Sequence, residues 1–243
     1  MTRPAIPCAR IIRRASVHAV LGFTCCVTAF PFLWMAVSSL KTKEEVLDTA
    51  SFLPSVPQFG NYRSILADSP IPGYLANSFF VSLAAAAIQL VCCALFTYAV
   101  TFMKIRGRDM LFRLVLFTYM VPTAVTYIPC YIILSRMGLL DSYQGLILSN
   151  GVSVFGIFLL HQAFEAVPKE TMEAARMDGA GHLSILTRII VPMTRPSFMT
   201  FILLSFINTY NSYMWPSLIT DSPNLSLISQ GLRRFLYEGG AYG

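Results

Sequence analysis

Acidic and small side chains gather in one polar segment, residues 165–195, which separates two long apolar stretches. A proline near its start can begin a helix, and Glu173 then lies in the first turns, where an acidic side chain favours the positive end of the helix dipole. Gly179 is expected to end this helix. Ala174 and Ala175 would let another surface approach it closely, although an ordinary connecting loop has a similar composition.

Polar side chains also interrupt the apolar stretches themselves. Polar groups are costly against lipid, so these residues should face a cavity or a neighbouring helix. Hydrogen bonding between helices explains them about as well as a cavity does. In the last apolar stretch, residues 197–220, they are Asn208, Asn211, Ser212 and Tyr213. Weaker candidates in the third stretch, residues 111–134, are Tyr119, Thr123, Thr126 and Tyr127.

The residue types needed for catalysis or for ion coupling are missing from the sequence. The five apolar stretches contain neither Asp nor Glu, whereas ion-driven transporters usually place ionisable groups near mid-membrane. The sequence has no H-E-x-x-H, G-x-S-x-G or Walker A motif, and its six cysteines do not match zinc spacing. We therefore predict no enzyme activity, no catalytic or metal-binding residue and no bound cofactor. If the protein moves a solute against its gradient, the energy would have to come from a partner, because the apolar stretches contain no group that could couple transport to an ion.

Composition indicates that these residues are positioned by helices in a membrane. Only 12% of the 243 residues are charged and 55% are apolar, whereas soluble domains carry about 25% charged residues. Five apolar stretches of about 18 residues or more can each cross a hydrocarbon core of about 30 Å, and in lipid they should be helical. The expected fold is an all-α transmembrane bundle with spans at Val17–Leu40, Ala76–Phe102, Leu111–Leu134, Leu146–Ala163 and Ser197–Thr220.

The basic residues predict the orientation of the chain. With a cytoplasmic N-terminus, 12 of the 18 Lys and Arg residues lie inside, as the positive-inside rule requires. The first stretch contains PFLW at residues 31–34 in its last part and has no small-residue cleavage site, so it is interpreted as a retained span. Residues 41–75 then form an outside segment with a short helix near 61–66. Pro122 and Pro129 are expected to kink the third span.

The polar segment resembles a known motif. Glu173-Ala174-Ala175 followed by Gly179, with Pro192 13 residues after that glycine, is similar to the E-A-A-x-x-x-G…I-x-L-P loop of type I ABC importer permeases. The resemblance implies that this loop forms a coupling helix, which docks on a separate ATPase subunit. The docking residues implied in this way are Glu173, Ala174, Ala175, Asp178 and Gly179.

Other motifs are similar to the carbohydrate branch of that family, to which maltose-type and glycerol-phosphate-type permeases belong. Residues 39–41 (SLK) and 59–62 (FGNY) resemble its S-L-K…F-x-N-Y pattern, and residues 77–78 resemble its N-S pair. Residues 210–216 (YNSYMWP) resemble its W-N-x-[FY]-x-W-P segment, with Tyr210 in place of the usual tryptophan.

The resemblance also implies the organisation of the protein and its partners. Residues 1–75 would form a cytoplasmic tail, the first span and an external loop, and residues 76–243 the transmembrane core. The family normally has a sixth span, so we expect a fragment or a truncated product. The implied partners are a second permease subunit, ATP-binding subunits carrying ATP–Mg, an extracytoplasmic solute-binding protein and membrane lipid, but no nucleic acid. The implied location is the bacterial or archaeal cytoplasmic membrane.

The function implied by the resemblance is import of a sugar, an oligosaccharide or a glycerol-phosphate-like solute. Its pathway would be lined by Asn208, Asn211, Ser212, Tyr213, Tyr119 and Thr123. Two alternatives remain open from the sequence. One is a self-contained channel or facilitator, which needs neither a docking loop nor an ATPase, and the other is an inactive remnant.

Overall fold

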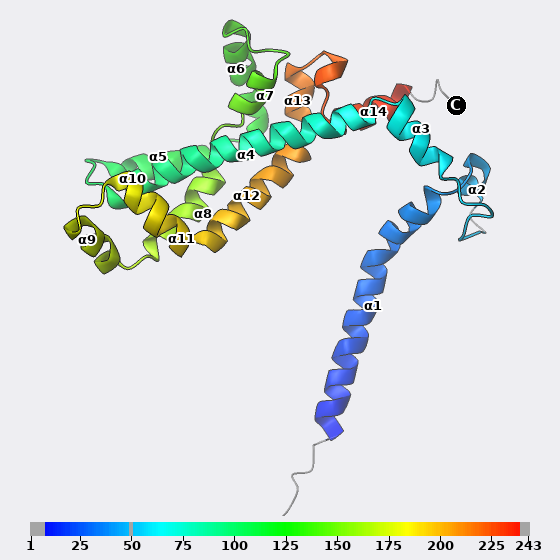
Figure 1. Cartoon of the computed structure of the whole chain (residues 1–243), viewed down its shortest axis with the longest axis horizontal. Coiled ribbons are helices and arrows are strands. Elements are labelled where there is room, and N and C mark those ends of the chain that lie inside the picture. The colour runs from blue at the N-terminus through cyan, green and yellow to red at the C-terminus, as the bar shows by residue number, and fades with distance from the viewer. Residues whose placement is uncertain (1–7, 49–50, 239–243) are drawn as a thin grey trace, which may run out of the picture. The chain divides into compact units, whose positions relative to one another are not determined.

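The computed structural model describes residues 8–48 and 51–238. The chain divides into two compact units, Met1–Ser69 and Pro70–Gly243, and each is described here by itself (Figure 1). All regular structure in the described residues is helical, which confirms the predicted all-α class.

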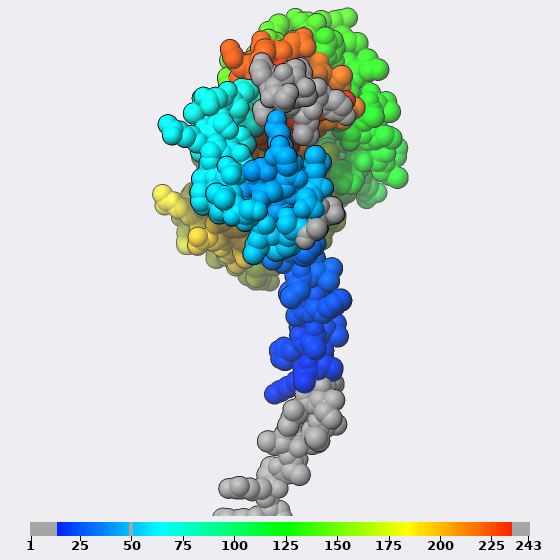
Figure 2. Space-filling model, turned by 90° about the vertical axis from the view of Figure 1, so that its right-hand side faces the viewer, coloured from blue at the N-terminus to red at the C-terminus, as the bar shows by residue number. Residues whose placement is uncertain are grey.

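The N-terminal unit begins with one long helix, α1 (Cys8–Ser38). Its apolar part, Arg14–Ser38, is long enough to cross a membrane, and none of it is buried within the structure. Figure 2 shows no other element of the N-terminal unit beside the lower part of α1 (blue). This helix therefore has an apolar surface that lipid or another protein must cover.

A small cap, residues 39–68, follows α1 and contains α2 (Lys43–Leu47) and α3 (Gly60–Asp68). The side-chain amide of Asn61 donates hydrogen bonds to the carbonyls of Ser39 and Lys41 at 3.0 and 3.2 Å. The start of α3 is thereby tied to the end of α1. These contacts lie within the S-L-K and F-x-N-Y patterns, so the two patterns serve one local structure.

The C-terminal unit is built on α4 (Ile71–Phe102), a continuous helix that contains the whole second predicted span. The helices α8 (Val154–Glu165) and α12 (Arg195–Tyr210) pack along it (Figure 1). At Gly156 a Cβ atom would lie 2.2 Å from the ring of Phe201, so only glycine allows α8 and α12 to approach this closely.

The third predicted span is broken rather than continuous. It is divided into α5 (Arg108–Thr118) and α6 (Thr123–Arg136), which meet at an angle of 102°. Pro122 adopts an extended backbone at the break and has no amide hydrogen to donate to a helical hydrogen bond. Pro129, by contrast, lies inside α6, which continues through it. Of the two expected kinks, the one at Pro122 is thus a sharp break.

The fourth and fifth predicted spans are also interrupted. In the fourth, α7 (Tyr143–Leu148) ends before a non-helical segment, and the hydroxyl of Ser153 then caps α8 by accepting a hydrogen bond from the amide of Gly156. In the fifth, α12 ends at Tyr210 and α13 (Met214–Ile219) begins after three intervening residues. The prediction of one continuous helix for each long apolar run was therefore wrong for these spans.

By length and composition, two of the described helices could cross a membrane alone, Arg14–Ser38 and Ile71–Phe102. The number rises to four if each of two bent pairs is counted as one span. The predicted number of five spans stays a prediction. The remaining elements are α9 (Lys169–Met177), α10 (His182–Ile185), the π-helical segment Leu186–Ile190, α11 (Val191–Met193), the 3-10 turn Pro223–Leu225 and α14 (Ile228–Glu238).

Asp141 joins two turns at one end of the C-terminal unit. Its carboxylate accepts hydrogen bonds from the amides of Asp221 and Ser222 and from the hydroxyl of Ser222. These donors hold the pKa of Asp141 below its usual value, the side-chain hydrogen bond of Ser222 being the largest cause. The turn after α6 and the turn after α13 are thus held together by a carboxylate.

Candidate functional site

The E-A-A residues lie on α9, which has the bounds that local signals predict. Pro168 precedes the helix, and its fixed φ suits the start of a helix. The helix is followed by Gly179, whose φ of +79° is in a region that L side chains rarely adopt. The predicted helix and its glycine turn are therefore present.

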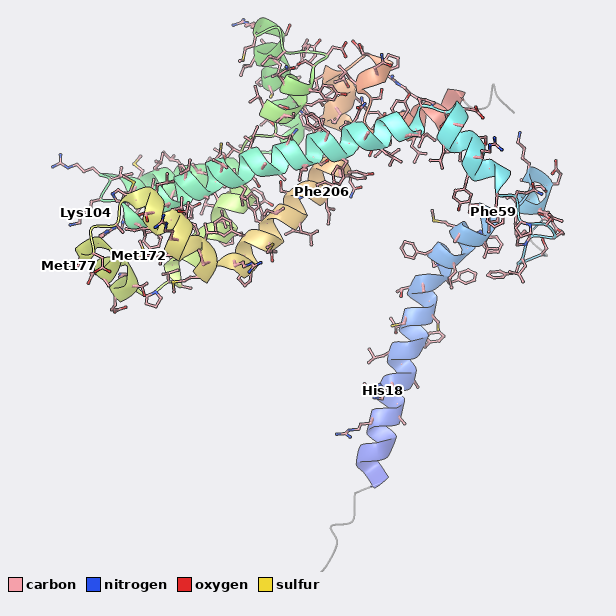
Figure 3. All side chains as sticks on the ribbon, viewed as in Figure 1. His18, Phe59, Lys104, Met172, Met177 and Phe206 are labelled. Atoms are coloured by element: carbon pink, nitrogen blue, oxygen red, sulfur yellow. The ribbon has the colours of Figure 1, made fainter. Side chains whose placement is uncertain are left out.

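One face of α9 is anchored in the apolar core and the other is exposed. Met172 and Ala175 are buried, and both belong to the larger of the two apolar clusters of the unit. Glu173 and Ala174 are exposed, and Met177 is 88% exposed. Figure 3 shows Met177 near one end of the C-terminal unit. Of the five predicted docking residues, Ala175 therefore faces inward.

Two polar contacts attach the loop around α9 to the end of α4. The guanidinium of Arg176 donates a hydrogen bond to the carbonyl of Phe102 at 2.9 Å. The hydroxyl of Tyr98 lies 3.0 Å from Nδ1 of His182. The last carbonyls of a helix have no hydrogen-bond partner within the helix. The guanidinium of Arg176 therefore supplies a donor to one of these carbonyls at the end of α4.

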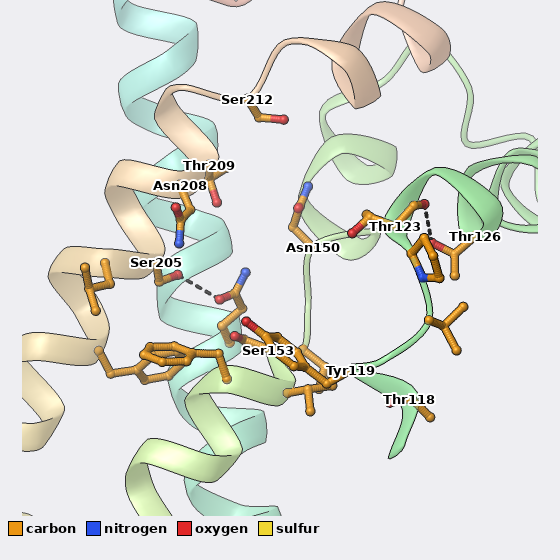
Figure 4. A pocket seen from close by; sticks show the side chains of 18 of the residues that line it. Thr118, Tyr119, Thr123, Thr126, Asn150, Ser153, Ser205, Asn208, Thr209 and Ser212 are labelled. Atoms are coloured by element: carbon orange, nitrogen blue, oxygen red, sulfur yellow. Dashed lines mark hydrogen bonds between the residues drawn. The ribbon is translucent and has the colours of Figure 1, made fainter. Parts of the chain in front are cut away.

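A cavity of about 970 Å³ opens in the C-terminal unit (Figure 4). Its walls come from α4, from α12 and from the segments where the third and fourth predicted spans are interrupted, residues 118–123 and 150–155. The end of α12 contributes Asn208 and Thr209, and the segment after it contributes Ser212. The three interruptions thus meet around one cavity. Non-helical backbone at membrane depth is tolerated where it lines such a cavity.

Hydrogen-bonding groups in this cavity are neutral and only partly satisfied. The hydroxyl of Ser205 on α12 donates to Oε1 of Gln89 on α4 at 2.8 Å, and both side chains are buried (Figure 4). Within the described part of the chain, the amide nitrogen of Gln89 and the side chains of Asn208 and Thr209 have no hydrogen-bond partner. No described residue that lines the cavity is charged. Neutral donors and acceptors of this kind match hydroxyl groups on a solute.

The structure brings four of the six predicted pathway residues together. Tyr119, Thr123, Asn208 and Ser212 line the large cavity, as does the weaker candidate Thr126. Asn211 is exposed and does not line it. The sixth predicted residue, Tyr213, and the weaker candidate Tyr127 lie elsewhere. Tyr213 borders a smaller cavity of about 360 Å³, where its hydroxyl accepts a hydrogen bond from Arg233, and Tyr127 stacks on Trp215 at 5.3 Å between ring centroids.

Sequence reasoning missed several lining residues. Gln89 is the strongest case, because a glutamine in the middle of a 32-residue apolar helix is itself a signal of a cavity or of a helix contact. The others have a weaker signal, since serine and threonine are common in membrane helices and can bond to their own backbone. The missed residues are Gln89, Thr118, Asn150, Ser153, Ser205 and Thr209.

No three His, Cys, Asp or Glu side chains come together as a possible metal site in the described ranges. The candidate functional features of the C-terminal unit are therefore the exposed face of α9 and the neutral cavity.

Comparisons with known proteins identify the architecture. A solved bacterial ABC transporter involved in the import of the acidic polysaccharide alginate has a chain that matches with a TM-score of 0.84, covering 99% of this chain and 88% of that one at 24% identity. At this level of identity the match shows the fold.

Sequence relatives cover most of the chain. The sn-glycerol-3-phosphate transport system permease protein UgpE of Agrobacterium fabrum is 30% identical over 235 residues, which is 93% of this chain and 83% of the relative. The arabinooligosaccharides permease AraQ of Bacillus subtilis is 30% identical, covering 87% and 76%. The lactose permease LacG of Rhizobium radiobacter is 27% identical, covering 87% and 77%.

The model of one protein family matches residues 91–241, which include α9 and nearly all of the cavity wall. The chain thus belongs to the family of inner membrane components of binding-protein-dependent transport systems, and it is a transport permease of the membrane.

Proposed function

We propose that this chain is one permease subunit of an ATP-driven importer for a sugar, an oligosaccharide or a glycerol-phosphate-like solute. The relatives named above support this range of solutes, because they transport glycerol phosphate, lactose and arabinooligosaccharides according to their names. An extracytoplasmic binding protein would deliver the solute to a pair of permease subunits.

The observation that carries the proposal is the exposed face of α9. A helix that is anchored by Met172 and Ala175 can transmit force to the core, while Glu173 and Ala174 remain free to contact another protein. ATP hydrolysis in a partner would supply the energy, with ATP–Mg bound there, since the chain has no nucleotide-binding motif. ATP binding shifts the equilibrium between two conformations of the transporter only to the extent that ATP binds one conformation more tightly than the other.

We further propose the orientation and the pathway. The N-terminus would be cytoplasmic, residues 1–75 would carry the tail, the first span and an external loop, and residues 76–243 would form the transmembrane core. The large cavity would contribute to the pathway through Asn208 and Ser212 with Tyr119 and Thr123 opposite. Because its lining is neutral, uncharged solutes fit it better than phosphorylated ones.

A pull-down from mild detergent tests the docking role. The chain carrying Glu173→Arg and Gly179→Trp is compared with the native chain and with a Lys104→Glu control. Lys104 is exposed and lies at the same end of the unit as Met177 (Figure 3), so the control makes a charge change of similar size beside α9 but outside the predicted docking residues.

We expect the native chain and the control to recover a nucleotide-binding subunit and the double variant to lose it. Recovery by all three would place the ATPase contact elsewhere. If no ATPase associates with any of them while the purified chain still passes solute across vesicles, a self-contained facilitator becomes the better reading.

A further inference from the structure

The short helix α3 in the cap has one apolar side and one polar side. At 100° per residue, Phe59, Tyr62, Ile65 and Leu66 fall on one side of the helix. Asn61, Ser64 and Asp68 fall on the other side, and Arg63 lies at the border next to Phe59. Such a separation requires an apolar surface for the helix to rest on.

The apolar side of α3 is only partly covered within the N-terminal unit. Phe59 is 70% exposed and Leu66 is 66% exposed, and no residue of α3 is buried. The polar side already has its contacts, since the side chain of Asn61 bonds to the end of α1. Phe59 and Leu66 on the apolar side therefore remain largely uncovered within the N-terminal unit.

The length of α1 gives the height of α3 relative to a membrane. No Asp, Glu, Lys or Arg lies between Arg14 and Trp34, and the 20 residues from one to the other rise about 30 Å, which equals the thickness of a hydrocarbon core. Tryptophan is enriched at the edge of this core. The amine of Lys41 lies 4.9 Å from the centre of the Trp34 ring, so a basic group accompanies the aromatic one there. Arg14 and Trp34 thus mark the two edges.

The contacts of α3 place it just beyond the Trp34 edge. Ser39 follows Trp34 by five residues, about 8 Å along the helix axis, and the headgroup layer on one side of a bilayer is about 5–8 Å thick. The hydroxyl of Tyr62 lies 2.6 Å from the hydroxyl of Ser39. Since the Asn61 amide also bonds to the Ser39 carbonyl, α3 is held at the level of the headgroups.

We propose that α3 is an interfacial helix, which lies in the headgroup layer of the leaflet where α1 ends and inserts Phe59, Ile65 and Leu66 among the acyl chains. An amphipathic helix with a tyrosine at its edge is suited to this position. The role of α3 is then to fix how deeply α1 sits in the bilayer.

Depth-dependent fluorescence quenching tests this inference. The full chain, with its six native cysteines replaced, receives a single cysteine as Leu66→Cys or, as the matched control two residues earlier, Ser64→Cys. Each is labelled with the environment-sensitive dye NBD and reconstituted in vesicles of phosphatidylethanolamine and phosphatidylglycerol. The vesicles carry a doxyl quencher either near the headgroup or near the end of the acyl chain.

We expect dye at residue 66 to emit at shorter wavelength than dye at residue 64 and to lose most of its emission to the quencher near the headgroup. Dye at residue 64 should instead be quenched by iodide in the water. Water-like emission at both positions, or equal quenching of both by lipid, overturns the inference. Short-wavelength emission at residue 66 without lipid quenching also overturns it, because a protein surface then covers the helix. These results do not depend on the ATPase or on the solute.

Discussion

The hydroxyl of Tyr98 on α4 lies 3.0 Å from Nδ1 of His182, the first residue of α10. The two rings are close to perpendicular, at 76°, with their centroids 5.8 Å apart. Together with the bond from Arg176 to the carbonyl of Phe102, this pair connects both sides of the turn at Gly179, which follows α9, to the longest helix of the unit. A displacement of α9 would therefore be passed to α4 through direct polar contacts.

We predict that Tyr98→Phe weakens the coupling of ATP hydrolysis to transport. The substitution removes one hydrogen bond of about 1 kcal/mol, which corresponds to about a fivefold change in an equilibrium. Solute uptake per ATP hydrolysed by the reconstituted importer should fall by about this factor, while the rate of hydrolysis is retained. Thr187→Val is the control, since the hydroxyl of Thr187 bonds only to the carbonyl of Leu183 within the same turn. A parallel loss of uptake and hydrolysis would contradict the prediction.

Two asparagines on one helix end should differ in their effect on transport. Asn208 lines the large cavity, whereas Asn211, three residues later, does not. We expect Asn208→Leu to raise the KM for solute uptake by about threefold to tenfold, the cost of one or two lost hydrogen bonds. Asn211→Leu should leave the KM unchanged. Equal effects of the two substitutions on uptake in reconstituted vesicles would show that the cavity is not where the solute is recognised.

Gly156 should tolerate no larger residue. Its missing side chain leaves room for the ring of Phe201, and a Cβ atom there would lie 2.2 Å from that ring. Overpacking of this kind typically costs about 1–3 kcal/mol, so Gly156→Ala should lower the thermal unfolding midpoint in detergent. Gly22→Ala is the control, because no atom lies within 4 Å of the added carbon. Combining Gly156→Ala with Phe201→Leu should cost less than the sum of the two single changes.

The turn contact of Asp141 should weaken in acid. Its pKa is lowered from 3.8 by hydrogen bonds from the hydroxyl and amide of Ser222 and from the amide of Asp221, so its stabilising effect is present at neutral pH. Because the folded-state pKa is the lower one, this effect is lost only as pH falls below about 4. Hydrogen-exchange protection of the amides of Asp221 and Ser222 should drop in that range. Asp141→Asn should reduce the protection at neutral pH and remove its pH dependence.

Local signals predicted local structure well. The helix α9 was expected from a proline at its start and Gly179 at its end, because such signals act within a few residues of the backbone. The positions of Met172 and Ala175 in the core also follow a helical period. By contrast, the role of Ala175 as a docking residue came from the family motif, which does not distinguish the buried face of the helix from the exposed one.

The helix breaks could not be predicted from hydropathy. Windows that contain Pro122 or Asn211 remain apolar on average, so a run of apolar residues hides the point where the backbone turns. Whether a proline breaks a helix, as at Pro122, or is accommodated, as at Pro129, depends on what packs beside it. The cavity itself joins residues more than a hundred positions apart, such as Gln89 and Ser205, and no local pattern predicts that pairing.

The position of α4 in the chain has a consequence for biosynthesis. It is the first element of the C-terminal unit to be made, and α5, α7, α8, α12 and α14 all pack against it. It is also apolar and long enough to enter a bilayer without them. Chains are made and folded from the N-terminus onward, so each later, broken segment leaves the ribosome when its partner is already in the membrane. Segments too interrupted to insert independently thus meet a surface on which their polar backbone groups can be accommodated.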